Sequence, residues 1–194
     1  DTLLLYDILS ANMYAHPAKL RKGARTQLTA TYVASQRIIY MVGGFTTVDR
    51  TNVVNAVDVY NTVATNLAQA FNAGADQFNL VVPRGGHSAT LMNDNLVLLA
   101  GGYDGAAALN SIEIIHEYVG VDIAGQPTSQ IDIVTSCTTA DCQSPINNML
   151  TGRWGHTATF LEQGTVLFVG GRSGTASGGM SPVLDLDLFN PQPQ

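Results

Sequence analysis

Short apolar runs alternate with polar turns along the chain, and this pattern predicts a protein built from short β-strands. Three of these runs are apolar at consecutive positions: IIYMV at 38–42, LVLLA at 96–100 and VLFV at 166–169. A strand with that pattern is buried on both faces, whereas a half-exposed strand alternates apolar and polar residues. In an antiparallel meander, burial on both faces requires each sheet to be stacked between two neighbours. The pattern therefore predicts stacked sheets.

Each of the three runs belongs to a longer unit that occurs three times. Arg84-x-x-His87-Ser-Ala-Thr is followed by Gly101-Gly102, and Arg153-x-x-His156-Thr-Ala-Thr by Gly170-Gly171. A third copy runs from Arg25-x-x-Leu28-Thr-Ala-Thr to Gly43-Gly44. A unit that recurs at this spacing is the signature of a repeat architecture. These residues are predicted to build the repeat: Arg25, Gly43, Gly44, Arg84, His87, Gly101, Gly102, Arg153, His156, Gly170 and Gly171.

The repeat predicts four short strands per unit, joined as an antiparallel meander. The expected strands are 3–7, 26–34, 37–42, 56–60, 87–92, 95–100, 111–116, 130–135, 156–161, 165–169 and 183–189. Residues 62–73 have apolar spacing that suits a helix, but their match to residues 8–14 favours a turn and a strand. The small residues of TAT, SAT and TAT suit the narrow inner edge at which radially packed sheets converge. Because its first segment matches 57–68, the chain is expected to begin midway through a repeat.

The elements MVGGF, LLAGGYDG and LFVGGR, each preceded by R-x-x-H or R-x-x-L, resemble kelch repeats. The resemblance covers nearly the whole chain except 117–152. It implies an all-β fold: a kelch-type β-propeller segment of about three four-stranded antiparallel blades, part of a larger ring. Residues 1–194 are then one segment, divided into the end of one blade (1–24), a blade (25–83), a blade with a long insert (84–152) and an incomplete blade (153–194). The fourth-strand tryptophan of the family is absent, and the only tryptophan, Trp154, lies within an R-x-x-H element.

Composition narrows the expected partners and location. The chain is 45% hydrophobic and 12% charged, with a net charge of −6, which suits a soluble protein and gives no reason to expect nucleic acid. No apolar run reaches the length of about 18 residues that a membrane helix needs. Cys137 and Cys142 lie in CTTADC, where further zinc ligands are absent, so a disulfide-closed loop is expected. A disulfide indicates an oxidising compartment, and we expect an exported protein, extracellular or periplasmic.

The order of the strands predicts which loops carry the function. Links between strands 1 and 2 of each unit are minimal, whereas the long links 16–25, 45–54, 71–83, 103–109, 138–152 and 172–180 fall on the opposite face. Binding residues commonly ride on long loops held by a rigid scaffold. This face is predicted to bind a protein or a glycan. It carries the basic residues of the link 16–25 (Lys19, Arg21, Lys22 and Arg25), for which a solvated loop is the alternative interpretation. The candidate binding residues are Lys19, Arg21, Lys22, Asp104 and Arg172.

Patterns that indicate catalysis are sparse. His87 and His156 recur at one repeat position, which favours a structural role over a metal site. His116 with Tyr118 resembles the His/Tyr copper site of galactose oxidase, a related propeller, but no cysteine here matches its cross-linked residue. Asp185 and Asp187 share a strand face, and Asp187 matches Asp58 and Glu113 in the repeat. We therefore expect no enzyme, no metal and no cofactor. The alternatives are a structural subunit of an extracellular assembly whose neighbours complete the propeller, and a fragment of a galactose oxidase-type copper enzyme.

Overall fold

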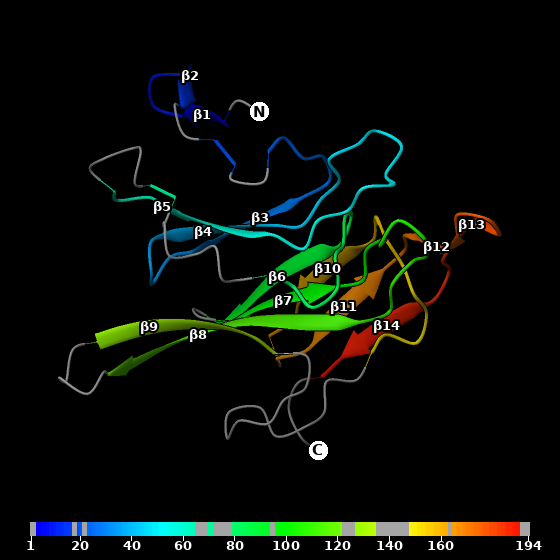
Figure 1. Cartoon of the computed structure of the whole chain (residues 1–194). Helices are drawn as coiled ribbons and strands as arrows, with labels where there is room; N and C mark the ends of the chain where they lie inside the picture. The colour runs from blue at the N-terminus through cyan, green and yellow to red at the C-terminus, as the bar shows by residue number, and fades with distance from the viewer. Residues whose placement is uncertain are drawn as a thin grey trace.

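A computed structural model describes residues 3–16, 19–20, 23–64, 70–71, 79–93, 96–121, 127–134, 148–162 and 164–190. These residues form antiparallel β-sheets joined by turns and loops, and no helix occurs among them (Figure 1). Within this part of the chain there is accordingly no helix long and apolar enough to cross a membrane. The fold class is all-β, with sheets arranged as the blades of a propeller segment.

Three sheets make up the body of the protein, and in each of them the strands follow one another in chain order. The first sheet contains β3 (Thr29–Val33), β4 (Ile38–Val42) and β5 (Val57–Asn61). The central sheet contains β6 (Ser88–Asn93), β7 (Leu96–Ala100), β8 (Ile112–Val121) and β9 (Pro127–Val134). The last sheet contains β10 (Thr157–Phe160), β11 (Val166–Val169) and β14 (Leu186–Phe189). Each is an antiparallel meander.

Two hairpins accompany these sheets. β1 (Leu3–Asp7) pairs with β2 (Asn12–His16) ahead of the first sheet. β12 (Arg172–Thr175) pairs with β13 (Gly179–Pro182) between β11 and β14. In Figure 1 the central sheet lies between the first sheet and the last, with β1 and β2 beyond the first sheet. β6 contacts both β3 and β10, so the three sheets converge along their first strands.

The core lies in two layers, one on each side of the central sheet. Alternate side chains of β7 point into different layers, because successive residues of a strand face opposite sides. Val97 and Leu99 pack against the first sheet, in a cluster that includes Tyr40 and Val59. Leu98 and Ala100 pack in the other layer, which includes Val166 and Phe168 of the last sheet. The consecutive apolar residues of LVLLA are thus explained by burial on both faces.

The two outer sheets differ in how their far sides are covered. On the first sheet, Met41 and Tyr60 are buried under a third cluster to which Ala70 and Phe71 contribute. On the last sheet no described residue covers the far side: Val169, Leu186 and Leu188 are exposed, so the prediction that VLFV is buried on both faces is wrong for this strand. The stack therefore has one covered end and one open apolar end.

Several segments differ from the sequence-based predictions. The segment 172–180 was predicted to be a loop, but it contains most of the β12–β13 hairpin, whose close pairing needs Gly174: a Cβ there would lie 2.1 Å from the carbonyl oxygen of Gly179. Residues 117–121 were predicted to be a loop, but they extend β8 and pair with β9 as far as Val121 opposite Pro127. In the segment 62–73, Phe71 forms a bridge with Tyr60, as expected for a strand and not for a helix.

Burial on both faces predicts the effect of truncating a core residue. Leu98 is 0% exposed, so Leu98→Ala leaves a cavity and is expected to lower the free energy of unfolding by about 2–5 kcal/mol. Leu188, which is 68% exposed, provides the matched control, because Leu188→Ala is expected to change it by less than about 0.5 kcal/mol. Urea unfolding of both variants measures the difference, and equal losses would contradict the stacking of the central sheet.

Candidate functional site

The three repeat arginines are buried, and each forms an ion pair with an acid on the third strand of its own sheet. Arg25 pairs with Asp58, Arg84 with Glu113, and Arg153 with Asp187 at 2.6 Å. All three arginine side chains are 0% exposed. A buried charge is tolerated only when it is paired and hydrogen-bonded. These charged residues therefore hold each sheet together and are not available to a ligand.

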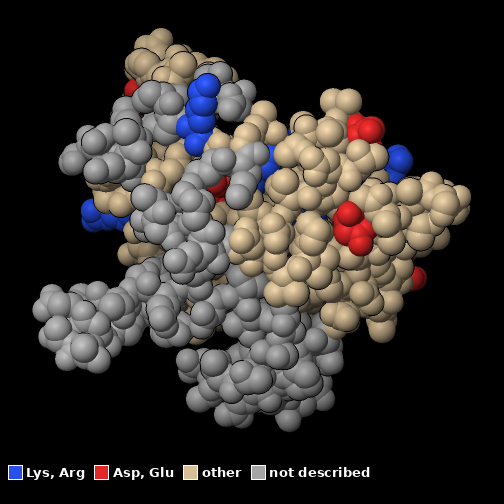
Figure 2. Space-filling model, in the orientation of Figure 1, with Lys and Arg blue, Asp and Glu red and all other residues tan. Residues whose placement is uncertain are grey.

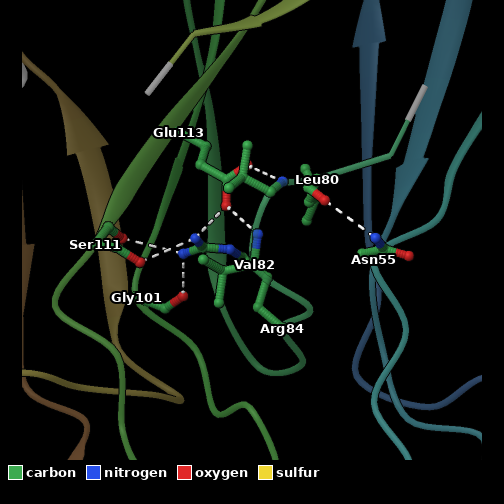
Figure 3. A network of polar contacts seen from close by, with 8 residues as sticks. Asn55, Leu80, Val82, Arg84, Gly101, Ser111 and Glu113 are labelled. Carbon is green, nitrogen blue, oxygen red and sulfur yellow. Dashed lines mark hydrogen bonds and ion pairs between the residues drawn. The ribbon is translucent and has the colours of Figure 1, made fainter. Parts of the chain in front are cut away.

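The middle pair is held by several hydrogen bonds (Figure 3), although Arg84 Nε is buried without a partner. Arg84 Nη1 donates to the carbonyl oxygens of Gly101 at 2.7 Å and Ser111 at 3.0 Å. Glu113 accepts hydrogen bonds from the amides of Val81 at 2.8 Å and Val82 at 3.2 Å, which lie in the segment that enters the central sheet. Burial lowers the pKa of Arg84, and the opposite charge of Glu113 counters part of that effect. The pair thereby fixes the segment that connects the first sheet to the central sheet.

The two repeat histidines join neighbouring sheets. His87 Nε2 lies 2.9 Å from Thr29 Oγ1 of the first sheet. His156 Nε2 lies 2.9 Å from Ser88 Oγ of the central sheet. Burial, reinforced by the positive charge of Arg84, lowers the pKa of His87 to about 3. Burial and the charge of Arg153 lower the pKa of His156 to about 4. Both imidazoles are therefore neutral near pH 7 and act as uncharged hydrogen-bonding groups between blades.

The glycine pairs let neighbouring backbones approach closely. The amide of Gly44 donates to the carbonyl oxygen of Arg84 at 2.9 Å, and the amide of Gly102 to that of Arg153 at 2.8 Å. Gly43 and Gly101 have φ angles of 62° and 63°. A Cβ on Gly43 would lie 2.2 Å from the Arg84 oxygen, so no other residue fits there. Arginine, histidine and glycines thus form one repeated junction between sheets.

The candidate site is formed by the long segments beyond the glycine pairs (residues 45–54, 103–109 and 172–182) together with residues 154–155, and we call it the loop face. Ala107 forms a bridge with Thr175, and the amide of Ala108 donates to the carbonyl oxygen of Gly174 at 2.9 Å. Gly105 lies against Thr51, such that a Cβ on Gly105 would be 3.2 Å from the Thr51 oxygen. Loops from three successive sheets therefore lie side by side, on the face predicted from the order of the strands.

Trp154 lies at the centre of the loop face. The guanidinium of Arg50 lies over its ring, 4.9 Å from the ring centroid, and the ring of Tyr103 is 6.0 Å away. Phe45 continues the row, 6.4 Å from Tyr103. Arg50 is exposed and adopts a φ of 61°, which is uncommon for a residue other than glycine. The indole Nε1 of Trp154 is buried without a hydrogen-bond partner. This cluster combines an exposed cation with aromatic rings.

The predicted binding residues do not gather at this cluster. Arg172 is exposed on the loop face, and its backbone pairs with that of Trp154. Asp104 accepts hydrogen bonds from Ala106 and Ala107 within its own turn. Lys19 is exposed, whereas Arg21, Lys22, Cys137 and Cys142 lie outside the described residues. Figure 2 shows the described charged side chains as separate groups on a mostly uncharged surface.

The remaining sequence candidates do not converge on a metal. His116 lies on β8 with Asp132 opposite in the register, and the Tyr118 side chain lies outside the part that the structure describes. Asp187 is engaged with Arg153, and Asp185 is exposed. No group of three or more His, Cys, Asp or Glu side chains able to hold a metal occurs among the described residues. Sequence reasoning missed Arg50 and Tyr103; the signal was that Tyr103, like Phe45, directly follows a glycine pair.

Comparison with known proteins supports the fold alone. No protein-family model matches the chain, and no curated protein matches it. Among solved structures, the fold is similar to that of a propeller protein, in a structure titled "Structure of YjhT". The TM-score is 0.54 and the sequence identity is 14%. The match covers 97% of this chain and 48% of the other, so the chain spans about half the length of that protein.

Removing the charge of Glu113 is expected to destabilise the central sheet strongly. Glu113→Gln leaves Arg84 buried without a counter-charge, which costs about 3–5 kcal/mol in the free energy of unfolding. Adding Arg84→Met removes the unpaired charge and is expected to recover part of that loss. Asp185→Asn, at an exposed acid, is the control and is expected to change stability by less than about 0.5 kcal/mol. Denaturant unfolding measures all three, and a neutral Glu113→Gln would contradict the role of the pair.

Because both histidines are neutral in the folded chain, the protein is expected to lose stability in mild acid. Below pH 6.5 the unfolded chain protonates both histidines, whereas in the folded chain their pKa values of about 3 and about 4 keep them neutral. The unfolded state then binds more protons, so the free energy of unfolding falls as pH falls. Each histidine is expected to contribute a loss of about 2 kcal/mol between pH 7.5 and 5.

Urea unfolding at the two pH values measures this loss. The double variant His87→Gln and His156→Gln lacks both titrating groups and serves as the comparison. Unfolded carboxylates titrate near pH 4, so they contribute little in this window. An equal pH dependence in the wild type and the double variant would show that these histidines are not responsible.

Proposed function

We propose that the chain is a non-catalytic kelch-type propeller segment that binds a protein or a glycan through its loop face. The observation that carries the proposal is the cluster in which Arg50 from one loop stacks on Trp154, which is two sheets further along the chain. The repeat arginines and histidines are taken up by internal contacts. On the loop face the exposed Arg50 and the half-buried Trp154 come together at the surface, above the buried rings of Tyr103 and Phe45.

The chemistry of the cluster supports recognition. Tryptophan, tyrosine and arginine are the residues that most often dominate binding energy at interfaces. The half-buried Trp154 offers a rigid ring surface that rests against the buried ring of Tyr103, and the exposed Arg50 offers a planar set of hydrogen-bond donors for carboxylates, carbonyls or hydroxyls. The stacked sheets beneath hold these side chains on a fixed scaffold. Such a face needs no metal and no cofactor to bind its ligand.

We place this binding function outside the cytoplasm, in an extracellular or periplasmic setting. The support is the sequence CTTADC, in which Cys137 and Cys142 are proposed to close a small loop through a disulfide. That segment lies outside the described residues. The proposed location would also bring the loop face into contact with secreted proteins or surface glycans.

Cross-linking tests the binding face with a matched pair of alanines. A benzoylphenylalanine placed at Ala106 on the loop face is expected to form adducts with the partner, while one at Ala34, exposed in the turn between β3 and β4, is expected to form none. Extracellular fluid from the source organism and a glycan microarray supply the two ligand classes. Arg50→Ala is expected to weaken binding about tenfold, a loss of about 1.4 kcal/mol. Equal adduct yields from the two positions, or unchanged binding by the variant, would contradict the proposal.

A second candidate function is that of a structural subunit in an assembly whose neighbours complete the propeller. The open face of the last sheet favours it, because Leu186 and Leu188 are 63% and 68% exposed. Contiguous apolar residues at a protein surface commonly mark an interaction site. This candidate does not exclude binding through the loop face, since the two surfaces are formed by different residues.

A further inference from the structure

The outer side of the last sheet has the composition of a buried face. We call it the open face, and it comprises Thr157, Leu167, Val169, Leu186 and Leu188. The register places these residues together, with Val169 opposite both Thr157 and Leu186, and Leu167 opposite Leu188. Three of the four apolar side chains are at least 40% exposed.

The same repeat positions are buried in the central sheet. Leu98 and Ala100 take the places of Leu167 and Val169, and Ile112 and Ile114 take those of Leu186 and Leu188. All four residues of the central sheet are 3% exposed or less, because the last sheet covers them. The open face therefore has the composition of a sheet–sheet interface, without a sheet on it among the described residues.

Half of a junction accompanies this apolar surface. At the two internal junctions, a Cβ on Gly43 or Gly101 would lie within 2.3 Å of the next arginine's carbonyl oxygen and within 3.0 Å of the next histidine's ring. Gly170, with a φ of 72°, holds the same repeat position, yet no described atom lies within 4 Å of a Cβ placed there. The space that is filled at Gly43 and Gly101 is therefore open at Gly170.

The hydrogen-bonding groups of the half-junction are also in place. Thr157 has the repeat position of Thr29 and Ser88, whose hydroxyls bond the next histidine at 2.9 Å. The Thr157 hydroxyl makes one long contact in the described structure, 3.5 Å to the Val169 carbonyl oxygen. Gly171 has the position of Gly44 and Gly102, whose amides donate to the next arginine's carbonyl oxygen at 2.9 and 2.8 Å. The open face thus presents an open space, a hydroxyl and an amide in the arrangement found at the two internal junctions.

We propose that the open face is a docking surface for one occupant: a further four-stranded sheet whose first strand carries an Arg-x-x-His segment. The carbonyl oxygen of its arginine accepts the hydrogen bond of the Gly171 amide. Its imidazole fills the space over Gly170 and hydrogen-bonds Thr157. Its apolar strands cover Leu186 and Leu188. This inference is independent of the loop face, since none of these residues takes part in the Arg50–Trp154 cluster.

The histidine excludes a second copy of this chain as the matching occupant. The internal Arg-x-x-His segments at 84–87 and 153–156 are already docked on neighbouring sheets. The remaining segment, Arg25-x-x-Leu28, has a leucine in place of the imidazole, and that leucine packs in the cluster of Met41 and Tyr60. A second copy would leave Thr157 without its partner, so the chemistry of the face points to a different sheet.

The first experiment extends the whole chain in repeat register. Asn190 has the repeat position of His116, so residues 1–190 followed by a copy of residues 117–190 add a fourth strand and a second R-W-G-H segment. In the extended chain the Gly171 amide is expected to exchange with solvent at least about tenfold more slowly than in the parent, because it gains an acceptor. Changing the appended histidine to leucine, as at position 28, is expected to remove much of that protection.

The Gly102 amide is the internal standard, because its acceptor is present in both chains. Protection at Gly102 shows that the parent part has folded, and protection of the strand amides in the appended copy of 157–169 shows that the added part has folded. Fast exchange at Gly171 in an extended chain that protects both would overturn the proposal. Equal protection of the Gly171 amide in the leucine variant and in the histidine-containing extended chain would also overturn the proposal.

A second experiment does not depend on folding of the extended chain. The intact 194-residue chain is titrated with the peptide of residues 150–162, LTGRWGHTATFLE, or with the same peptide carrying leucine in place of histidine. The histidine peptide is expected to shift the NMR signals of Gly170, Gly171 and Thr157, and not those of Gly43 and Gly101, whose places are filled. Equal shifts from both peptides, or none at millimolar peptide, would overturn the proposal.

Sedimentation of the chain alone tests whether a second copy of it covers the open face. The chain is expected to sediment as a monomer of about its 20.5 kDa mass. A dimer that Leu188→Glu dissociates would show that a second copy covers the open face without an imidazole, which would overturn the proposal.

Discussion

The close approach of two backbones at each glycine pair is the contact on which the stacking of the sheets depends. An arginine carbonyl oxygen can accept a hydrogen bond from Gly44 or Gly102 only because the preceding glycine has no Cβ in its path. The arginine whose carbonyl makes this contact extends its side chain into its own sheet and meets a buried acid there. One residue therefore joins two sheets through its backbone and secures its own sheet through its charge.

This arrangement explains why residues that suggest chemistry have structural roles. Buried arginines, acids and histidines in a cleft are the usual signs of an active site. Here the arginine is neutralised by its acid, and the histidine is held neutral by burial and by the charge of the arginine. The charged groups are paired within the stack, although Arg84 Nε and the Nδ1 atoms of His87 and His156 are buried without a hydrogen-bond partner. Surface chemistry is left to the loops that follow the glycines, where Arg50 and Trp154 meet.

The loop face and the open face are consequences of one repeat. The loop face varies between units, because Phe45, Tyr103 and Arg172 take the same place after the glycine pair. Most of the repeat positions that form the open face are apolar in each unit, and in the central sheet they are covered by the next sheet. A surface that varies from unit to unit suits recognition of a ligand, and a surface that is repeated suits joining of like sheets. Two kinds of interaction thus have separate locations on one scaffold.

The sequence by itself determined most of the strands, their order and the double burial of the second strand in the first and central sheets. These are local or periodic properties, and the repeats reinforced one another. Tertiary structure alone decided which repeat positions touch, such as Arg84 with Glu113 across 29 residues, because pairing depends on the register of non-local strands. It also decided that Arg50 reaches Trp154 and that 172–182 forms a hairpin against the loop 103–109. Loop contacts vary between units, so no periodicity in the sequence could indicate them.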